Sequence, residues 1–200
     1  MGAPSESDGG SSDSAAARPE AASEAAAPAE AVPAEAGPVV RRIQADEGAR
    51  LRQVRLDAIA ESPGDFTTRL TDARDRPAEA WDRVAEVHAA ADDQATWFAE
   101  VGTDTAGIIS AFRTEDGAVT MTSLWSTPGH RRSGVADVLV ATVRDWAYEG
   151  GAVEIRQWLV ERNAHARAFH ESLGFEPTGH ERPYEPSPDI GEVELRLPLR

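Results

Sequence analysis

Apolar positions beyond residue 38 follow two periods. Short runs rich in apolar and β-branched residues predict strands over residues 39–43, 96–101, 106–113, 118–126, 153–160, 175–179 and 193–199. Apolar side chains that recur at steps of three and four residues predict helices over residues 51–59, 81–88, 135–146 and 166–173. Strands and helices alternate along the chain, so the pattern predicts one mixed α/β domain over residues 39–200.

Short polar segments set the limits of the first elements. Asp46 is suited to cap the first helix, and the Ser62–Asp65 segment, with its Pro and Gly, ends it. A polar loop over residues 66–76 follows, and Pro77 suits the first turn of the next helix, whose Trp81 we assign to the core. The turns between the second, third and fourth strands suit hairpins, so these three strands are expected to be antiparallel.

The most informative segment is the turn that joins the strand at 118–126 to the next helix. A helix that begins there points unpaired backbone N–H groups, and the positive end of its dipole, into the turn. Gly134 would let a phosphate approach the backbone, and Arg131 and Arg132 add positive charge. We interpret the turn as a pyrophosphate-binding site.

Two motifs of this chain resemble those of the GNAT superfamily of N-acetyltransferases. The spacing Arg131-x-x-Gly134-x-Ala136, after a strand, resembles the acyl-CoA signature of that superfamily. The later segment Asn163–Phe175, with the sequence NAHARAFHESLGF, resembles its second motif. The two motifs stand in the expected order, with a predicted strand between them.

The resemblance covers residues 39–200 and implies a fold. That fold is a mainly antiparallel sheet of six to seven strands flanked by about four helices. Its central strands splay apart, and the cofactor's thioester lies in the gap. The implied co-substrate is acetyl-CoA.

The resemblance also implies roles for residues around the turn. The backbone N–H groups of Ser133, Gly134, Val135 and Ala136 would hold the pyrophosphate, whereas Arg131 and Arg132 would contribute charge. The backbones of Trp125 and Ser126 would bond the pantetheine arm, although the Trp125 side chain could equally serve the core or the acceptor pocket. Asn163 would contact the cofactor through its amide, and a plain helix N-cap is the alternative role.

His170 stands where the second motif usually has a tyrosine that protonates the leaving thiolate. Histidine can donate a proton near neutral pH because its unperturbed pKa is about 6.5. We therefore expect His170 to be a candidate general acid; the alternative is that it only packs or hydrogen-bonds and water protonates the thiolate.

Glu100, Glu154 and Glu161 are candidates for the base that deprotonates the amine, and nothing in the sequence selects one. The histidines lack metal-ligand spacing, so we expect no metal.

In GNAT proteins the first helices and the loop between them commonly wall the acceptor site. Asp65 and Phe66 are therefore candidate substrate contacts, although Phe66 could instead fill the core. The segment from Leu56 to Phe66 is similar to that of bacterial small-molecule members.

The predicted reaction is acetyl transfer from acetyl-CoA to a primary amine, on a small molecule or a peptide, by direct attack in a ternary complex. The alternative is a non-catalytic acyl-CoA-binding or sensor protein. A nucleotide-binding P-loop is excluded because no Gly-Lys-Ser/Thr follows the turn.

The composition of the chain argues against several classes of partner and one reaction route. The net charge of −15 argues against non-specific nucleic-acid binding, which needs a basic face. The chain has no cysteine, which excludes an acyl-cysteine route. We find neither a secretory signal nor an apolar run near the ~20 residues of a membrane span, so we expect a cytoplasmic protein without a membrane partner. Residues 1–38 are rich in Ala, Glu, Ser and Pro, and this composition predicts a disordered acidic leader. The sequence does not decide whether the protein forms a homodimer, as many GNAT proteins do.

Overall fold

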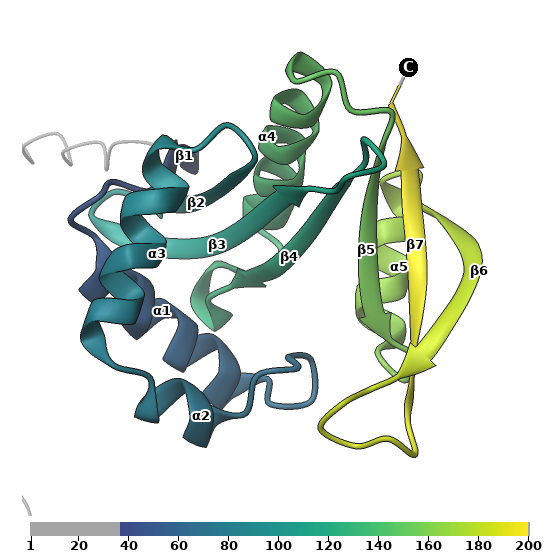
Figure 1. The fold of residues 1–200 in the computed structure, drawn as a ribbon, viewed down its shortest axis with the longest axis horizontal. Coiled ribbons are helices and arrows are strands. Elements are labelled where there is room, and N and C mark those ends of the chain that lie inside the picture. Colours follow the sequence, from purple (N-terminus) through teal and green to yellow (C-terminus); the bar gives the residue numbers. More distant parts are fainter. Residues whose placement is uncertain (1–36, 200) are drawn as a thin grey trace, which may run out of the picture. The chain divides into compact units, whose positions relative to one another are not determined.

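The structure is a computed structural model and describes residues 37–199. The predicted leader, residues 1–38, therefore lies almost wholly outside the described residues. The described part contains seven strands, five α-helices and one short 3₁₀ helix, η1 (Figure 1). Their bounds in chain order are β1 (Val39–Arg42), α1 (Gly48–Glu61), α2 (Leu70–Asp75), α3 (Ala78–Ala90), β2 (Gln94–Val101), β3 (Asp104–Arg113), β4 (Val119–Ser126), η1 (Pro128–His130), α4 (Val135–Glu149), β5 (Glu154–Val160), α5 (Ala164–Ser172), β6 (Glu176–Pro183) and β7 (Gly191–Pro198).

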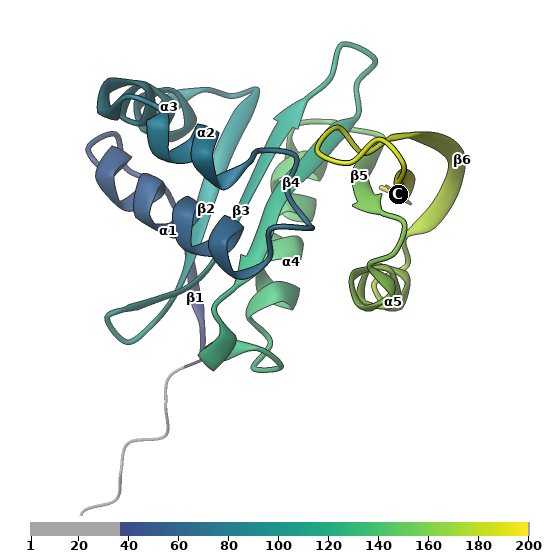
Figure 2. The same ribbon diagram turned by 90° about the horizontal axis from the view of Figure 1, so that it is seen from below.

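The seven strands form one sheet in the order β1-β2-β3-β4-β5-β7-β6. Neighbouring strands are antiparallel except β4 and β5, which are parallel. The helices α1, α2 and α3 cover one face of the β2–β4 part and α4 covers the other, as Figure 2 shows. This arrangement confirms the predicted α/β class and the mainly antiparallel sheet. Across residues 37–199 we find no helix with the length and apolar character needed to cross a membrane.

The sheet opens between β4 and β5. These strands pair at only two positions, Val119 with Ile155 and Thr120 with Arg156. Although β4 continues to Ser126 and β5 to Val160, the two then diverge (Figure 1). The facing backbone groups beyond this point have no strand partner, so an extended ligand can pair with them as an added strand does.

A bulge in β4 lies beside this opening. Ser110 of β3 pairs with Thr122, whereas Ile108 pairs with Trp125, so β4 has an extra residue between these two positions. Ser123 within it has a φ of 60°, which residues other than glycine seldom adopt. Bulges of this kind redirect side chains beside binding sites.

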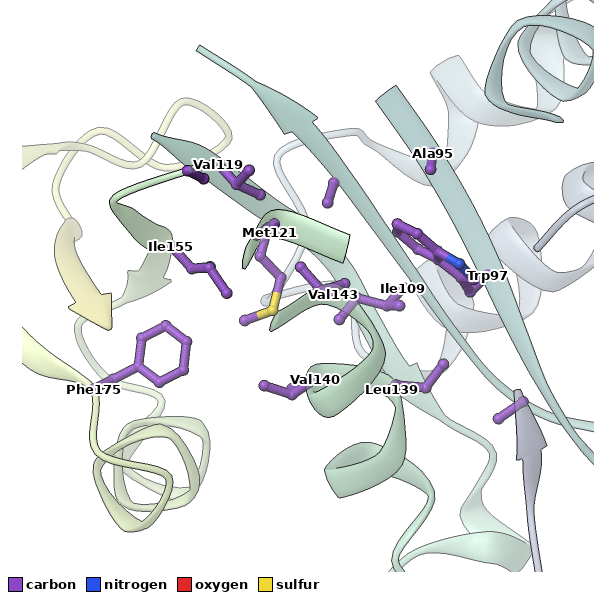
Figure 3. Packing of buried hydrophobic residues seen from close by; sticks show 14 of the residues in the cluster. Ala95, Trp97, Ile109, Val119, Met121, Leu139, Val140, Val143, Ile155 and Phe175 are labelled. Atoms are coloured by element: carbon purple, nitrogen blue, oxygen red, sulfur yellow. The ribbon is translucent and has the colours of Figure 1, made fainter. Parts of the chain in front are cut away.

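The core consists of two clusters, one on each face of the sheet, because successive strand residues point to opposite faces. Trp97 and Ile109 pack on the α4 side, whereas Phe98 and Ile108 pack with α1 and α3. The α4-side cluster also contains Phe175 from the β5–β7 half (Figure 3). That cluster therefore joins the two halves of the sheet although β4 and β5 share few hydrogen bonds.

Two local predictions are wrong. The expected polar loop contains α2, because its Ala73 is buried in the cluster with α1 and α3, and packing stabilises a helix too short to form alone. Asp46 does not cap α1. Glu47 occupies that position, and its carboxylate pairs with Arg41 and Arg50 instead of capping the helix.

Candidate functional site

The turn between β4 and α4 has a backbone conformation that favours glycine. Gly134 has a φ of 82° and stands at the N-cap of α4. The N–H of Val138 donates to the carbonyl oxygen of Gly134 at 3.1 Å, which leaves the preceding N–H groups without an intrahelical acceptor. A Cβ added at Gly134 would meet no atom within 4 Å. Open space thus lies over a set of backbone donors.

The side chains of this turn have separate roles. Arg131 forms an ion pair with Glu61 at the end of α1. Arg132, whose φ is 62°, makes no hydrogen bond or ion pair with any residue in the 37–199 range. The Ser133 hydroxyl donates to the carbonyl oxygen of His130 at 2.6 Å. Arg132 is therefore the cation of this turn that is available to a ligand.

A cavity of about 630 Å³, here called the larger cavity, begins at the turn. Its walls come from the ends of β4 and β5, the start of α4 and one face of α5. The predicted cofactor-binding residues that line it are Trp125, Ser126, Arg131, Arg132, Gly134, Ala136 and Asn163. Ser133 and Val135 do not line it, and Val135 is buried in the core, so its backbone N–H is the group it can offer.

Asn163 begins α5 as an N-cap. Its Oδ1 accepts a hydrogen bond from the Ala166 N–H at 2.9 Å. Its side chain also lines the larger cavity. The structure is therefore compatible with both roles considered for Asn163.

His170 is buried, with 2% of its surface exposed, and lines the larger cavity. Its ring lies edge-on to Phe169 and Phe175, at centroid distances of 5.3 and 5.2 Å. Nδ1 lies 2.8 Å from the Ala166 carbonyl oxygen, so Nδ1 carries the hydrogen and donates it. Nε2 is enclosed and has no partner among the described residues. Burial lowers the pKa of His170, so the ring is neutral near pH 7.

Trp125 links the cavity wall to α1. Its indole is buried in the cluster with α1 and α3, and its Nε1 donates to Oε2 of Glu61 at 3.2 Å. Hydrogen bonds from Ser62, Arg131 and Trp125 hold the pKa of Glu61 below its usual range. Glu61 therefore stays ionised and connects α1 to the β4–α4 turn.

A second cavity, of about 400 Å³, here called the smaller cavity, is lined by α1, the α1–α2 loop and the five strands β3 to β7. Five residues line both cavities: Asp65, Phe66, Ser123, Gln157 and Trp158. The two cavities therefore meet where β4 and β5 diverge, and we call this meeting point the junction. Asp65 and Phe66, predicted as substrate contacts, both lie there, and Phe66 is also part of the core.

Comparison with known families gives a direct assignment. The sequence model of the acetyltransferase (GNAT) family matches residues 56–175, which is more than half of the chain. The chain belongs to the GNAT family. No match was found among the curated proteins.

Solved structures of low sequence identity share the GNAT fold. An acetyltransferase of the GNAT family from Streptococcus pneumoniae has a TM-score of 0.69 and 16% identity, over 82% of this chain and 99% of its own. The protein yncA from Salmonella typhimurium, solved with its cofactor acetyl-CoA, has a TM-score of 0.65 and 16% identity, over 82% and 95%. A Bacillus anthracis protein in complex with acetyl coenzyme A has a TM-score of 0.52 and 19% identity, over 56% and 67%.

Several residues of the candidate site were not predicted from the sequence: Arg55, Gln157, Trp158, Arg182 and Glu192, which all line the smaller cavity. Two of them carry a signal in the sequence. Arg55 is four residues from Leu51 and from Ile59, so a charged residue interrupts the apolar face of α1. Gln157 interrupts the apolar part of β5.

The carboxylates considered as the base lie elsewhere in this GNAT domain. Glu100, Glu154 and Glu161 line neither cavity. Glu100 pairs with Arg41 and Arg50, and Glu154 pairs with Arg156. Among the described carboxylates, Asp65 alone lines both cavities. No cluster of three or more His, Asp or Glu side chains in residues 37–199 is placed to hold a metal ion.

Proposed function

We propose that the protein transfers an acetyl group from acetyl-CoA to a primary amine by direct attack in a ternary complex. The observation that carries this proposal is the junction, where a cavity from the start of α4 meets a second cavity between diverging strands. One substrate in each cavity brings the thioester and the amine together there. Holding two reactants in this way removes much of the entropic barrier to their reaction.

The larger cavity has the groups that acetyl-CoA needs. The N–H groups at the start of α4, over Ser133–Ala136, fit the diphosphate, and so does Arg132, which forms no ion pair within residues 37–199. The unpartnered edge of β4 at Trp125 and Ser126 fits the amide groups of the pantetheine arm. Arg131 lies beside Arg132, but its ion pair with Glu61 offsets most of its charge, so its proposed contribution is the smaller of the two. When bound, acetyl-CoA supplies an activated acyl group.

The chain supplies groups for each proton and charge in the reaction. Asp65 is placed to accept a proton from the amine, directly or through water, because it lines both cavities. The N–H groups of β4 that lack a strand partner are donors for a developing oxyanion. The proton that leaves the amine is balanced by one delivered to the departing thiolate.

His170 is the proposed donor of that second proton. Its Nε2 has no partner among residues 37–199, and the ring lines the cavity. The neutral ring already uses its Nδ1 hydrogen on the Ala166 carbonyl oxygen. Donation from Nε2 therefore requires the imidazolium form, which burial makes scarce near neutral pH.

Thermal unfolding with acetyl-CoA, CoA and ATP, followed by thiol-release assays with a panel of amines, tests the proposal. A ligand at a hundredfold excess over its Kd adds about 2.7 kcal/mol of stability. We expect a shift with both CoA ligands, none with ATP, and thiol release that depends on an amine. Binding of CoA without turnover of any amine would replace this proposal with that of an acyl-CoA sensor.

A further inference from the structure

At the wall of the smaller cavity lies Arg55, a cation that has no counter-ion among the residues that the structure describes. It lies on the face of α1 that also carries the buried Leu51 and Ile59. Its Nη1 is enclosed and has no hydrogen-bond partner in residues 37–199, and no carboxylate there lies within ion-pair distance. The guanidinium instead lies 5.0 Å from the ring centroid of Phe66.

A guanidinium in this position destabilises the protein unless a ligand supplies the missing negative charge. A buried charge without a partner loses its hydration and gains nothing in return. Burial and the nearby Arg76 lower the pKa of Arg55 to about 10, so the guanidinium stays charged near neutral pH. By contrast, Arg182 on the same cavity is paired with Glu192 at 2.6 Å. The cavity thus has a free site for one anionic group.

The junction has groups suited to the opposite end of a ligand. Asp65 lies there without an ion pair to any described residue. Gln157 donates through Nε2 to the Trp158 carbonyl oxygen at 2.9 Å, while its Oε1 is enclosed and has no partner in the described part of the chain. A carboxylate and an amide oxygen both accept hydrogen bonds from an amine or ammonium group. An amine is therefore favoured at the junction and an anion at Arg55.

We propose that the acceptor is a small amino-acid-like zwitterion, whose primary amine lies at the junction and whose carboxylate binds Arg55. This inference rests on the proposed acetyltransferase function and names its substrate class. A guanidinium binds a carboxylate through two parallel hydrogen bonds, which fixes orientation as well as charge. A cavity of about 400 Å³ suits a small molecule of this kind.

The test compares matched acceptors with the full-length protein and saturating acetyl-CoA. Thiol release is measured with each of the twenty common L-amino acids and with the carboxamide of each. A site with a half-buried cation, whose Nη1 is enclosed, discriminates against an acceptor that leaves it unpaired. We expect the best free amino acid to have a kcat/KM about a hundredfold above that of its carboxamide.

Substitutions on α1 test whether Arg55 causes the preference for the acid over the carboxamide. Arg55→Met keeps the aliphatic length but removes the charge, and we expect it to reduce the acid-to-amide ratio to within about threefold. Arg52→Met, on the same helix but outside both cavities, is the matched control and should keep the wild-type ratio. Arg55→Lys keeps the charge and should retain a reduced preference for the acid.

The outcomes separate the two proposals. A carboxamide used as well as its acid, or an acid preference that survives in Arg55→Met, overturns the zwitterion. Turnover of polyamines or of lysine peptides alone also overturns it, while the acetyltransferase function stands. If no amine of any kind releases thiol, the acetyltransferase proposal fails and the zwitterion with it. If Arg55→Met does not fold, the ratio of kcat/KM for the acid to that for its carboxamide in the wild-type protein still tests the zwitterion proposal.

Discussion

The two cavities that meet at the junction are made from different parts of the polypeptide. In the larger cavity, the groups proposed to bind acetyl-CoA come mainly from the backbone of one continuous segment, residues 131–136. The smaller cavity takes its groups from side chains distant in sequence, such as Arg55, Asp65 and Gln157. Backbone groups suit a ligand that every family member shares, because any sequence with the right φ angles supplies them. Side chains suit a ligand that differs between members.

This contrast has a consequence for substitution. The larger cavity should be sensitive to changes that alter backbone conformation and tolerant of many side-chain changes. Side-chain substitutions in the smaller cavity should have the opposite effect. They should change the fold little and change the choice of acceptor strongly. Substitutions in and beside the larger cavity test its side of this contrast.

Gly134→Val should nearly abolish binding of acetyl-CoA. A β-branched residue is strained at a φ of 82°, and its side chain would fill the open space over the backbone donors. Loss of two charge-assisted hydrogen bonds, about 2 kcal/mol each, raises the Kd about a thousandfold. Titration calorimetry measures the Kd. Gly129→Val is the control, because Gly129 lies in the same turn without a positive φ; equal binding by both variants would contradict the backbone account.

His170→Phe should lower kcat about a hundredfold at low pH, the lower end for general acid catalysis. Phenylalanine keeps the aromatic packing against Phe169 and Phe175, so the fold should survive. Because burial lowers the pKa of His170, the acid form is present only below that lowered pKa. The wild-type rate should therefore lose this contribution as pH rises through it. The pH profile of kcat checks this, and identical profiles for the two proteins would end the general-acid role.

Arg132→Ala should weaken acetyl-CoA binding roughly tenfold, which corresponds to about 1.4 kcal/mol. Arg132 is unpaired within the described residues, so its charge is available to a phosphate. Arg131→Ala is the comparison variant and should weaken binding less, because Glu61 already neutralises Arg131. The salt dependence of the Kd provides the measurement. A larger loss from Arg131→Ala would show that the Glu61 pair opens when the ligand binds.

Glu61→Gln should change either KM by less than about threefold, because a half-exposed ion pair contributes only about 0–1 kcal/mol. Glutamine still offers an oxygen to Trp125, 3.2 Å away in the present contact. Glu61→Ala removes that acceptor and should cost more. Steady-state kinetics with both substrates, together with urea unfolding, measures the difference. Equal effects of the two substitutions would rule out the hydrogen bond to Trp125 as the important contact.

Local features of the sequence predicted the parts that local interactions stabilise. Residues close in the sequence explain three features: the apolar and β-branched run from Val119 to Ser126, the glycine before α4 and the cap at Asn163. The larger cavity could be anticipated for this reason. The helix α2 could not, because its six residues depend on burial of Ala73 against other elements.

Residue patterns alone predicted the order of the seven strands and of four of the five α-helices in the described part, the glycine of the β4–α4 turn and the family. Three features came from the folded structure and not from these patterns: Arg55 faces a cavity with no counter-ion among the described residues, Gln157 lies at the junction, and Arg131 pairs with Glu61. The physical reason is the range of the interactions. Backbone conformation and capping act between near neighbours, whereas burial and charge pairing depend on which distant segments the fold brings together.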